Sequence, residues 1–231
     1  MNATQSVKQT ADVSGRETRR DGWRHFRSSM RFSMYTITHP FDGFWDLAHE
    51  HKGSLLVAHT WLALFLLTRV LKLMFTSFQF MNVAVQYLNV FEEVFSLLLP
   101  FLILCVANWS LTTLFDGKGR FRDIYTAMCY ALIPYVLIQL PLVFISNVLT
   151  FEEASLYTVL MSFSIVWCVF LAFVGLMEVH DYGPGRTLFF LAFTIVGACV
   201  IIFLILVFFS LLSDAYSFFA SFYREASYRL N

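Results

Sequence analysis

The sequence predicts an all-α fold, a polytopic membrane helix bundle of about five transmembrane helices with additional amphipathic helices at the membrane interface. The chain of 231 residues is 58% hydrophobic and contains 27 phenylalanines. Only 14% of its residues are charged, against the roughly 25% that is usual for soluble domains. A soluble domain of this size has no interior large enough for so many apolar side chains, so they must face lipid.

Composition and motifs argue against several functional classes. The formal net charge is zero, which gives no indication of nucleic acid as a partner. The four cysteines lie in or beside apolar runs without a CxxC spacing, which favours packing over a disulfide framework or a metal site. The stretch HEHK does not have the HExxH spacing of a zinc protease. We therefore predict no catalytic residues, no metal site and no cofactor.

Residues 1–53 form the predicted cytoplasmic N-terminal region. Residues 1–20 are polar, and we expect them to be disordered. In residues 20–37, apolar side chains such as Phe26, Met30 and Met34 recur at helical spacing beside a stripe of arginines. This pattern suits a helix in the membrane interface, although a disordered basic tail or a helix packed on a partner would also fit.

A second interfacial helix is predicted in residues 39–53. Pro40 suits its first turn, and Gly53 follows its expected end. Its apolar face consists of Phe41, Phe44, Trp45 and Ala48.

Residues 54–213 form a predicted five-span membrane domain. The expected spans are 54–75, 94–115, 124–149, 154–177 and 187–213. The last is long for one crossing, which indicates tilt. Residues 214–231 are predicted to be a short extracytoplasmic tail that forms a surface helix.

Two basic residues, Arg69 and Lys72, occupy the last two turns of the first span. Polar residues continue from them at spacings of three and four toward Glu93, which predicts a helix that leaves the bilayer and follows its outer surface. Whether residues 77–93 form this surface helix or extend the span stays open. Glu92 and Glu93 are candidates for ion pairs with the two cations.

Four residues within the spans are structural or pore candidates. Pro134 and Pro141 are seven residues apart on one helix face, with Gln139 between them, and Asn108 lies near the inner end of the second span. Proline-kinked helices often line a cavity or a flexible joint. Ordinary bundle packing is the alternative.

The loop DGKGRFRD, residues 116–123, joins the second and third spans. Its glycines predict a tight reversal that uses backbone angles other residues avoid. Its cations favour the cytoplasmic side. The loop is a topology-setting turn or a docking surface for a partner, and a phosphate-binding loop is disfavoured because GKG lacks the Walker pattern. Its candidate contact residues are Gly117, Lys118, Gly119, Arg120, Phe121 and Arg122.

The distribution of positive charge predicts the orientation. Eight lysines and arginines precede residue 54, and the two inner loops add three and one, whereas the C-terminal tail holds two. The positive-inside rule then places the N-terminus in the cytoplasm and the C-terminus outside it.

One set of residues carries a family resemblance. After the segment HPFDGFWDL, the pattern NW…GxGxFR…YAxxP runs through Asn108, Gly117, Gly119, Phe121, Arg122, Tyr130, Ala131 and Pro134. It resembles the Yip family of multi-spanning membrane proteins, most closely its short bacterial members. In eukaryotes the resemblance implies trafficking in the Golgi and endoplasmic reticulum, hetero-oligomers and contact with prenylated Rab GTPases. This chain lacks the DLYGP-type motif of that branch, so the bacterial cell membrane is the expected location.

The functional prediction follows from the resemblance and from the absence of catalytic motifs. We expect a non-enzymatic scaffold or adaptor of a membrane complex, such as an ABC-type sugar transporter or a trafficking complex. The expected partners are the lipid bilayer and other membrane proteins, either transporter subunits or a second copy of the chain. The alternative is a transporter or channel subunit with a path along the third span. A membrane enzyme would require polar side chains that converge at one depth.

Overall fold

The structure is a computed structural model that describes residues 24–230 except 25, 51, 78–88 and 116. Regular structure in these residues is helical, without a strand. Five segments of the described chain are long and apolar enough to cross a membrane. They are α3 (Leu55–Phe75), α4 (Val90–Leu114), α5 (Phe121–Ala131) with α6 (Ile133–Ile145) as one span, α7 (Ala154–His180) and α8 (Pro184–Leu230). The predicted fold class, a polytopic helical membrane bundle, is confirmed.

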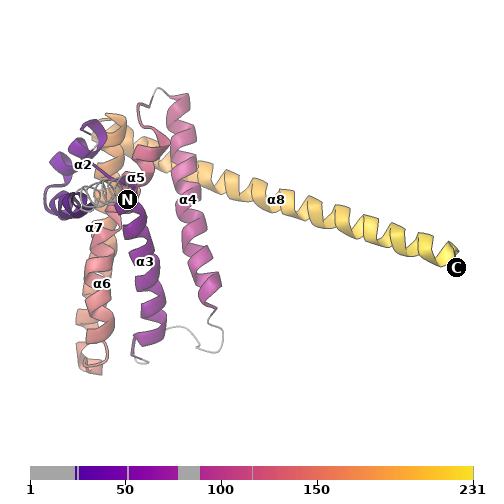
Figure 1. The fold of residues 1–231 in the computed structure, drawn as a ribbon, viewed down its shortest axis with the longest axis horizontal. Helices are drawn as coiled ribbons and strands as arrows, with labels where there is room; N and C mark the ends of the chain where they lie inside the picture. The colour runs from indigo at the N-terminus through magenta and orange to yellow at the C-terminus, as the bar shows by residue number, and fades with distance from the viewer. Residues whose placement is uncertain (1–23, 25, 51, 78–88, 116, 231) are drawn as a thin grey trace, which may run out of the picture.

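The spans α3, α4, α6 and α7 run alongside one another (Figure 1). We call the end that carries segments 115–120 and 181–183 the basic end, and the end that carries segment 146–153 the acidic end. The fully buried side chains of Phe44, Ile124, Tyr130, Ile133 and Leu171 belong to one core shared by α2 (Pro40–His49), α5, α6 and α7. The core therefore holds the start of the third span in the centre of the molecule.

The third span is broken between α5 and α6 at Leu132. Pro134 is the second residue of α6, where its missing amide hydrogen and its ring are tolerated, and α5 ends before it. Pro141 lies inside α6 without ending the helix. The kink expected from the two prolines is thus at Pro134.

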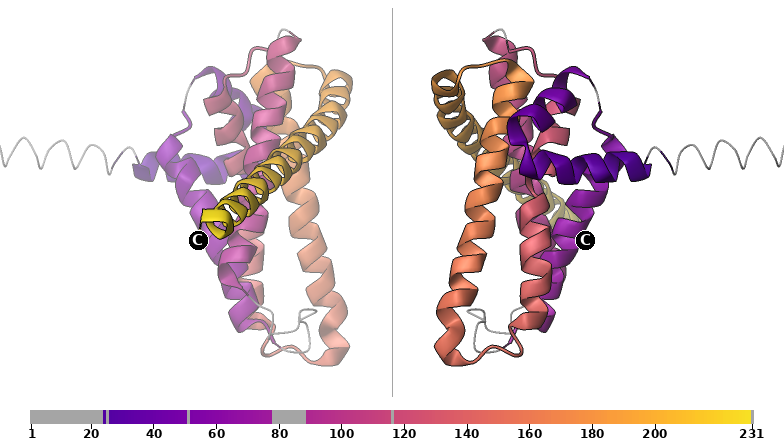
Figure 2. Two further views of the ribbon diagram at one scale, coloured as in Figure 1. Left: turned by 90° about the vertical axis from the view of Figure 1, so that its right-hand side faces the viewer. Right: turned by 90° about the vertical axis from the view of Figure 1, so that its left-hand side faces the viewer.

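Helical residues 26–38 and helix α2 lie across the bundle near its basic end (Figure 2). Residues 26–38 bury Ser29, Ser33 and Thr36, and the Trp61 indole nitrogen donates to Ser33 Oγ over 3.1 Å. Met34, by contrast, is 38% exposed. The small polar face is the most deeply buried, because small side chains allow close approach, while Phe26, Met30 and Ile37 of the apolar stripe are partly buried against the same core. The stripe that we expected to face the membrane interface is therefore partly used for packing within the protein.

Helix α2 begins at Pro40 as predicted but ends at His49, before Gly53. Phe44 and Leu47 are buried, whereas Phe41 and Trp45 remain half exposed. The predicted apolar face is therefore divided between the protein core and the surface.

The helix of the first span does not continue through Thr76, where we expected it to. Helix α3 ends at Phe75, and Thr76 has an extended backbone with ψ 137°. The turn at the acidic end caps α3, because Asn147 Nδ2 donates to the Phe75 carbonyl over 2.8 Å and Ser77 donates to Ser146 Oγ over 3.2 Å. Most of the expected surface helix, residues 78–88, lies outside the described residues, as does the tail of residues 1–20.

Helix α8 also differs from the expectation of a span 187–213 followed by a separate surface tail. It is one helix from Pro184 to Leu230, because no glycine or proline follows Gly197 in the sequence. Its first half packs on α4, where Ala198 lies against Ile103 and Ala107. Beyond this contact, α8 leaves the bundle and runs across its axis rather than along it (Figure 1).

The close approach of α2 to residues 26–38 gives a first prediction. A Cβ atom at Gly43 would lie 2.7 Å from Thr36 Cα, a backbone atom that cannot move aside alone. We expect Gly43→Ala to lower the free energy of unfolding in mixed micelles, because overpacking costs about 1–3 kcal/mol and outweighs a helix-propensity gain of roughly 1 kcal/mol.

Gly185→Ala is the matched control, since nothing lies within 4 Å of a Cβ there. Equal stability of Gly43→Ala and the wild-type chain would contradict this packing.

Candidate functional site

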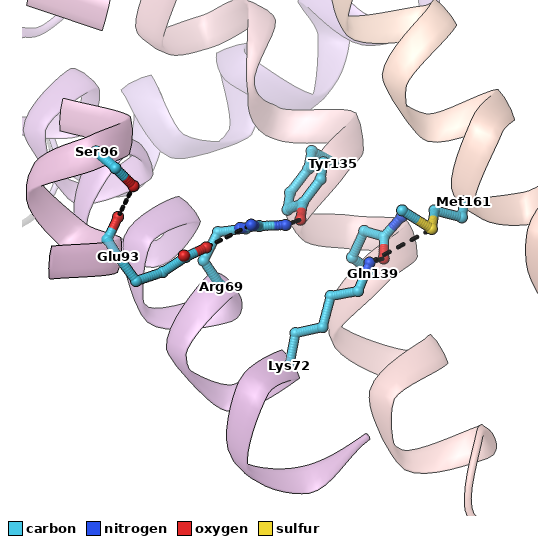
Figure 3. Close-up of polar contacts among 7 residues, drawn as sticks. All are labelled: Arg69, Lys72, Glu93, Ser96, Tyr135, Gln139 and Met161. Atoms are coloured by element: carbon cyan, nitrogen blue, oxygen red, sulfur yellow. Dashed lines mark hydrogen bonds and ion pairs between the residues drawn. The ribbon is translucent and has the colours of Figure 1, made fainter. Parts of the chain in front are cut away.

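A polar cluster crosses the bundle near the acidic end (Figure 3). Arg69 on α3 forms an ion pair with Glu93 on α4, and its Nη1 donates to Tyr135 Oη on α6 over 3.3 Å. The two charged side chains are 27% and 24% exposed. Arg69 lies six residues before the end of α3, which corresponds to a depth of about 9 Å. Of the candidate ion-pair residues, Arg69 and Glu93 are paired, and Glu92 is exposed.

Lys72 is positioned one turn further along α3 and contacts no glutamate among the described residues. Its Nζ donates to Gln139 Oε1 over 3.1 Å, and the Met161 sulfur lies 3.5 Å away. Gln139 is fully buried, and its Nε2 donates to Ser164 Oγ over 2.8 Å. A chain of hydrogen bonds therefore joins α3, α6 and α7.

This cluster holds helices together inside an apolar environment. Polar groups at membrane depth must be satisfied within the protein, since lipid offers no hydrogen-bond partner. Of the two cations, Arg69 is paired with the carboxylate of Glu93, whereas Lys72 contacts the neutral side chains of Gln139 and Met161. Between them they connect all four helices of the bundle. Sequence reasoning singled out Gln139 but missed Tyr135 and Ser164, whose roles depend on neighbours distant in sequence.

A second buried network lies toward the basic end around Asn108 on α4. Asn108 is 4% exposed, its Nδ2 donates to Thr194 Oγ1 on α8 over 3.1 Å, and its Oδ1 lies 3.0 Å from His180 Nε2 on α7. Because an amide oxygen only accepts, the hydrogen in the second bond is on Nε2. Asn108 therefore ties three helices together.

The described part of the loop, residues 117–123, lies closely over the ends of α4 and α7. None of the described glycines has a positive φ, so the expected unusual backbone angles are not the reason for Gly117 and Gly119. These positions require glycine because there is no room for a side chain. A Cβ at Gly119 would lie 2.6 Å from His180 Cε1, and one at Gly117 would lie 2.7 Å from Thr112 Cβ.

Three distant segments meet at Asp181, directly after α7. Asp181 has φ 58°, a left-handed conformation that aspartate tolerates better than most residues. Its carboxylate accepts from Lys118 Nζ over 2.8 Å and lies 3.8 Å from His49 Nε2 at the end of α2. The Lys118 ammonium holds the pKa of Asp181 below its ordinary value. Sequence reasoning chose Lys118 and missed Asp181.

The remaining side of the same loop adjoins a cavity of about 260 Å³. The cavity is lined by Leu47, Gly53, Arg120, Arg122, Asp123 and Thr126. The neighbouring Phe121 is 37% exposed, and its ring centroid lies 6.1 Å from that of Trp109. The six candidate contact residues therefore fall into three groups. Gly117, Lys118 and Gly119 adjoin the ends of α4 and α7, Phe121 lies against Trp109 on α4, and the two arginines line the cavity.

The pore candidates of the third span do not share one environment. Pro134 is buried, Pro141 is exposed and Gln139 is held by Lys72 and Ser164. The 260 Å³ cavity adjoins α5 at the basic end rather than α6. A transport path along Pro134, Gln139 and Pro141 remains a sequence prediction.

The fold and the two buried networks define a multi-pass helical membrane protein. The family model of the Yip1 domain matches residues 34–222, which include most of the chain and both networks. The chain therefore belongs to the Yip1 domain family. No curated protein and no solved structure matches the chain.

The Arg69–Glu93 pair predicts a measurable coupling between α3 and α4. In a double-mutant cycle with Arg69→Ala and Glu93→Gln, we expect a coupling free energy of about 0.5–3 kcal/mol, because both groups are largely removed from solvent. Unfolding in mixed micelles measures it. The exposed pair Lys52–Glu50 is the control, with an expected coupling below about 1 kcal/mol. Additive effects at Arg69 and Glu93 would contradict the pairing.

The lowered pKa of Asp181 predicts a pH dependence that Lys118 causes. A carboxyl whose pKa is lower in the folded chain stabilises it above the unfolded pKa of roughly 3.9, and this contribution is lost as the pH falls through the folded value. In Lys118→Ala, we expect carboxyl-labelled NMR to show Asp181 titrating at a higher pH. An unchanged titration would show that Lys118 does not hold the carboxylate.

Proposed function

We propose that this Yip1-domain protein is a non-enzymatic adaptor whose basic end binds another membrane protein. The observation that carries the proposal is the convergence of α2, the loop 116–123 and the turn after α7 on Asp181. Residues from three parts of the sequence thereby form one continuous polar surface.

The chemistry of this surface suits recognition. Lys118 is 74% exposed although its ammonium contacts Asp181, so it remains accessible to a partner. Arg186 is fixed at the same end, with Nη2 donating to the Phe115 carbonyl over 3.2 Å and its guanidinium 4.3 Å from the Tyr182 ring. Charges that are already positioned bind at a smaller entropic cost than mobile ones.

The proposed orientation places the basic end in the cytoplasm, since the lysines and arginines before and between the spans gather there. The bacterial cell membrane is the proposed location. An ABC-type sugar transporter is the partner to test first, because short bacterial Yip relatives resemble accessory proteins found alongside transport systems.

Purification of the tagged full chain in a mild detergent tests the adaptor function. We expect a stoichiometric membrane protein to copurify with the wild-type chain. Lys118→Glu places two carboxylates side by side and should reduce copurification at least about tenfold, a loss that corresponds to 1.4 kcal/mol. The double variant Lys118→Glu with Asp181→Lys restores an ion pair with exchanged charges and should recover most of the binding.

Lys52→Glu is the control for a change of charge alone, because Lys52 pairs with Asp46 and Glu50 away from Asp181. A topology reporter confirms that each variant keeps its orientation. If the wild-type chain purifies alone, or if Lys118→Glu binds as the wild type does, the adaptor proposal fails.

A further inference from the structure

The cavity beside α5 has the chemistry of a lipid headgroup site. We propose that the cavity lined by Arg120, Arg122 and Asp123 binds the phosphate of a membrane phospholipid, preferably an anionic one with a hydroxyl-bearing headgroup such as phosphatidylglycerol. The site is separate from the Asp181 contact and requires no protein partner.

Arg120 and Arg122 are cations of the basic end that internal contacts leave available. Three other cations there are engaged: Lys52 with Asp46 and Glu50, Lys118 with Asp181, and Arg186 with the Phe115 carbonyl. Within the described chain, neither guanidinium of Arg120 or Arg122 has such a contact. Planar guanidinium groups bind phosphate through paired, charge-assisted hydrogen bonds.

The backbone adds positive potential at the same place. Arg120 is the N-cap of α5, an 11-residue helix, and makes no side-chain cap hydrogen bond. The amides of Asp123 and Ile124 donate to the Arg120 carbonyl, which leaves the two preceding amides outside the helix ladder. The positive end of the helix dipole therefore adjoins the arginines.

The remaining lining residues determine which phosphate fits. The Asp123 carboxylate disfavours a bare dianionic phosphate and favours a headgroup with a hydroxyl donor. Gly53 allows its side of the cavity to pack closely on Leu47, because a Cβ at Gly53 would lie 2.9 Å from Leu47 Cγ. A volume of 260 Å³ is below the roughly 300–1,000 Å³ of drug-sized sites and suits a small polar group.

The position of the cavity points to a lipid rather than to a soluble ligand. It adjoins the start of the third span at Phe121. At the same end of the bundle, Trp45, Trp109 and Phe121 are 46%, 42% and 37% exposed. Exposed tryptophan and other aromatic rings at the end of a span mark the headgroup level of a bilayer.

Native mass spectrometry of the purified full chain with added phosphatidylglycerol tests this site. We expect Arg120→Gln with Arg122→Gln to weaken binding at least about tenfold, because both charged hydrogen-bond donors to the phosphate are lost. Arg27→Gln with Lys52→Gln removes the same charge from the same end and should change binding less than about twofold, because Arg27 is exposed and neither side chain lines the cavity. Equal losses in the two double variants, or no loss in either, would overturn the proposal.

Two further experiments on the wild-type chain identify the ligand. Phosphatidylcholine and soluble glycerol phosphate should each compete poorly with phosphatidylglycerol, and competition by glycerol phosphate at equal concentration would overturn the assignment to a lipid. In the wild-type chain, the side-chain ¹⁵N signals of Arg120 and Arg122 should shift on addition of the lipid. Unshifted signals would contradict the site even if a variant failed to fold.

Discussion

The structure depends on one constraint, which is that polar groups within an apolar bilayer must be satisfied by other parts of the protein. The bundle meets this constraint at two depths. Near the acidic end, the polar groups that satisfy one another belong to Arg69, Glu93, Lys72 and Gln139. Toward the basic end, they belong to Asn108, His180 and Thr194. Each network joins helices that are distant in sequence, so each contributes specific pairing where hydrophobic packing alone would allow many arrangements.

The two networks have different consequences for function. The one near the acidic end joins the four upright helices, and it explains why charged residues are tolerated in the first span. The one toward the basic end supports the overlying loop, because His180 lies under Gly119 and leaves no space for a larger residue. That loop then divides its cations between a fixed ion pair with Asp181 and an open cavity. The proposed protein contact and the proposed lipid contact therefore use different residues of one short segment.

Much of the fold could be predicted from the sequence, because long apolar runs and their separating loops are local signals. The first and fourth spans begin within a residue of their predicted starts, at Leu55 and Ala154. The predictions failed where contacts between residues distant in sequence determine where a helix ends or which of its faces is buried. Helix α3 ends at Phe75 because Asn147 caps it, and the N-terminal helix buries Ser33 because the Trp61 indole on α3 donates a hydrogen bond to it. Among the site residues, Lys118 could be selected by its charge, whereas Asp181 acquires its role only when the two loops meet.

The central claim is that the basic end is preassembled around Asp181 before any partner binds. Solid-state NMR of the full chain in lipid bilayers tests it most directly, through the dipolar coupling between the Lys118 side-chain nitrogen and the Asp181 carboxyl carbon. We expect a strong coupling, because the structure places Lys118 Nζ 2.8 Å from Asp181 Oδ2. The absence of that coupling in the unbound chain would show that the two loops are not joined, and the account of the basic end would be wrong.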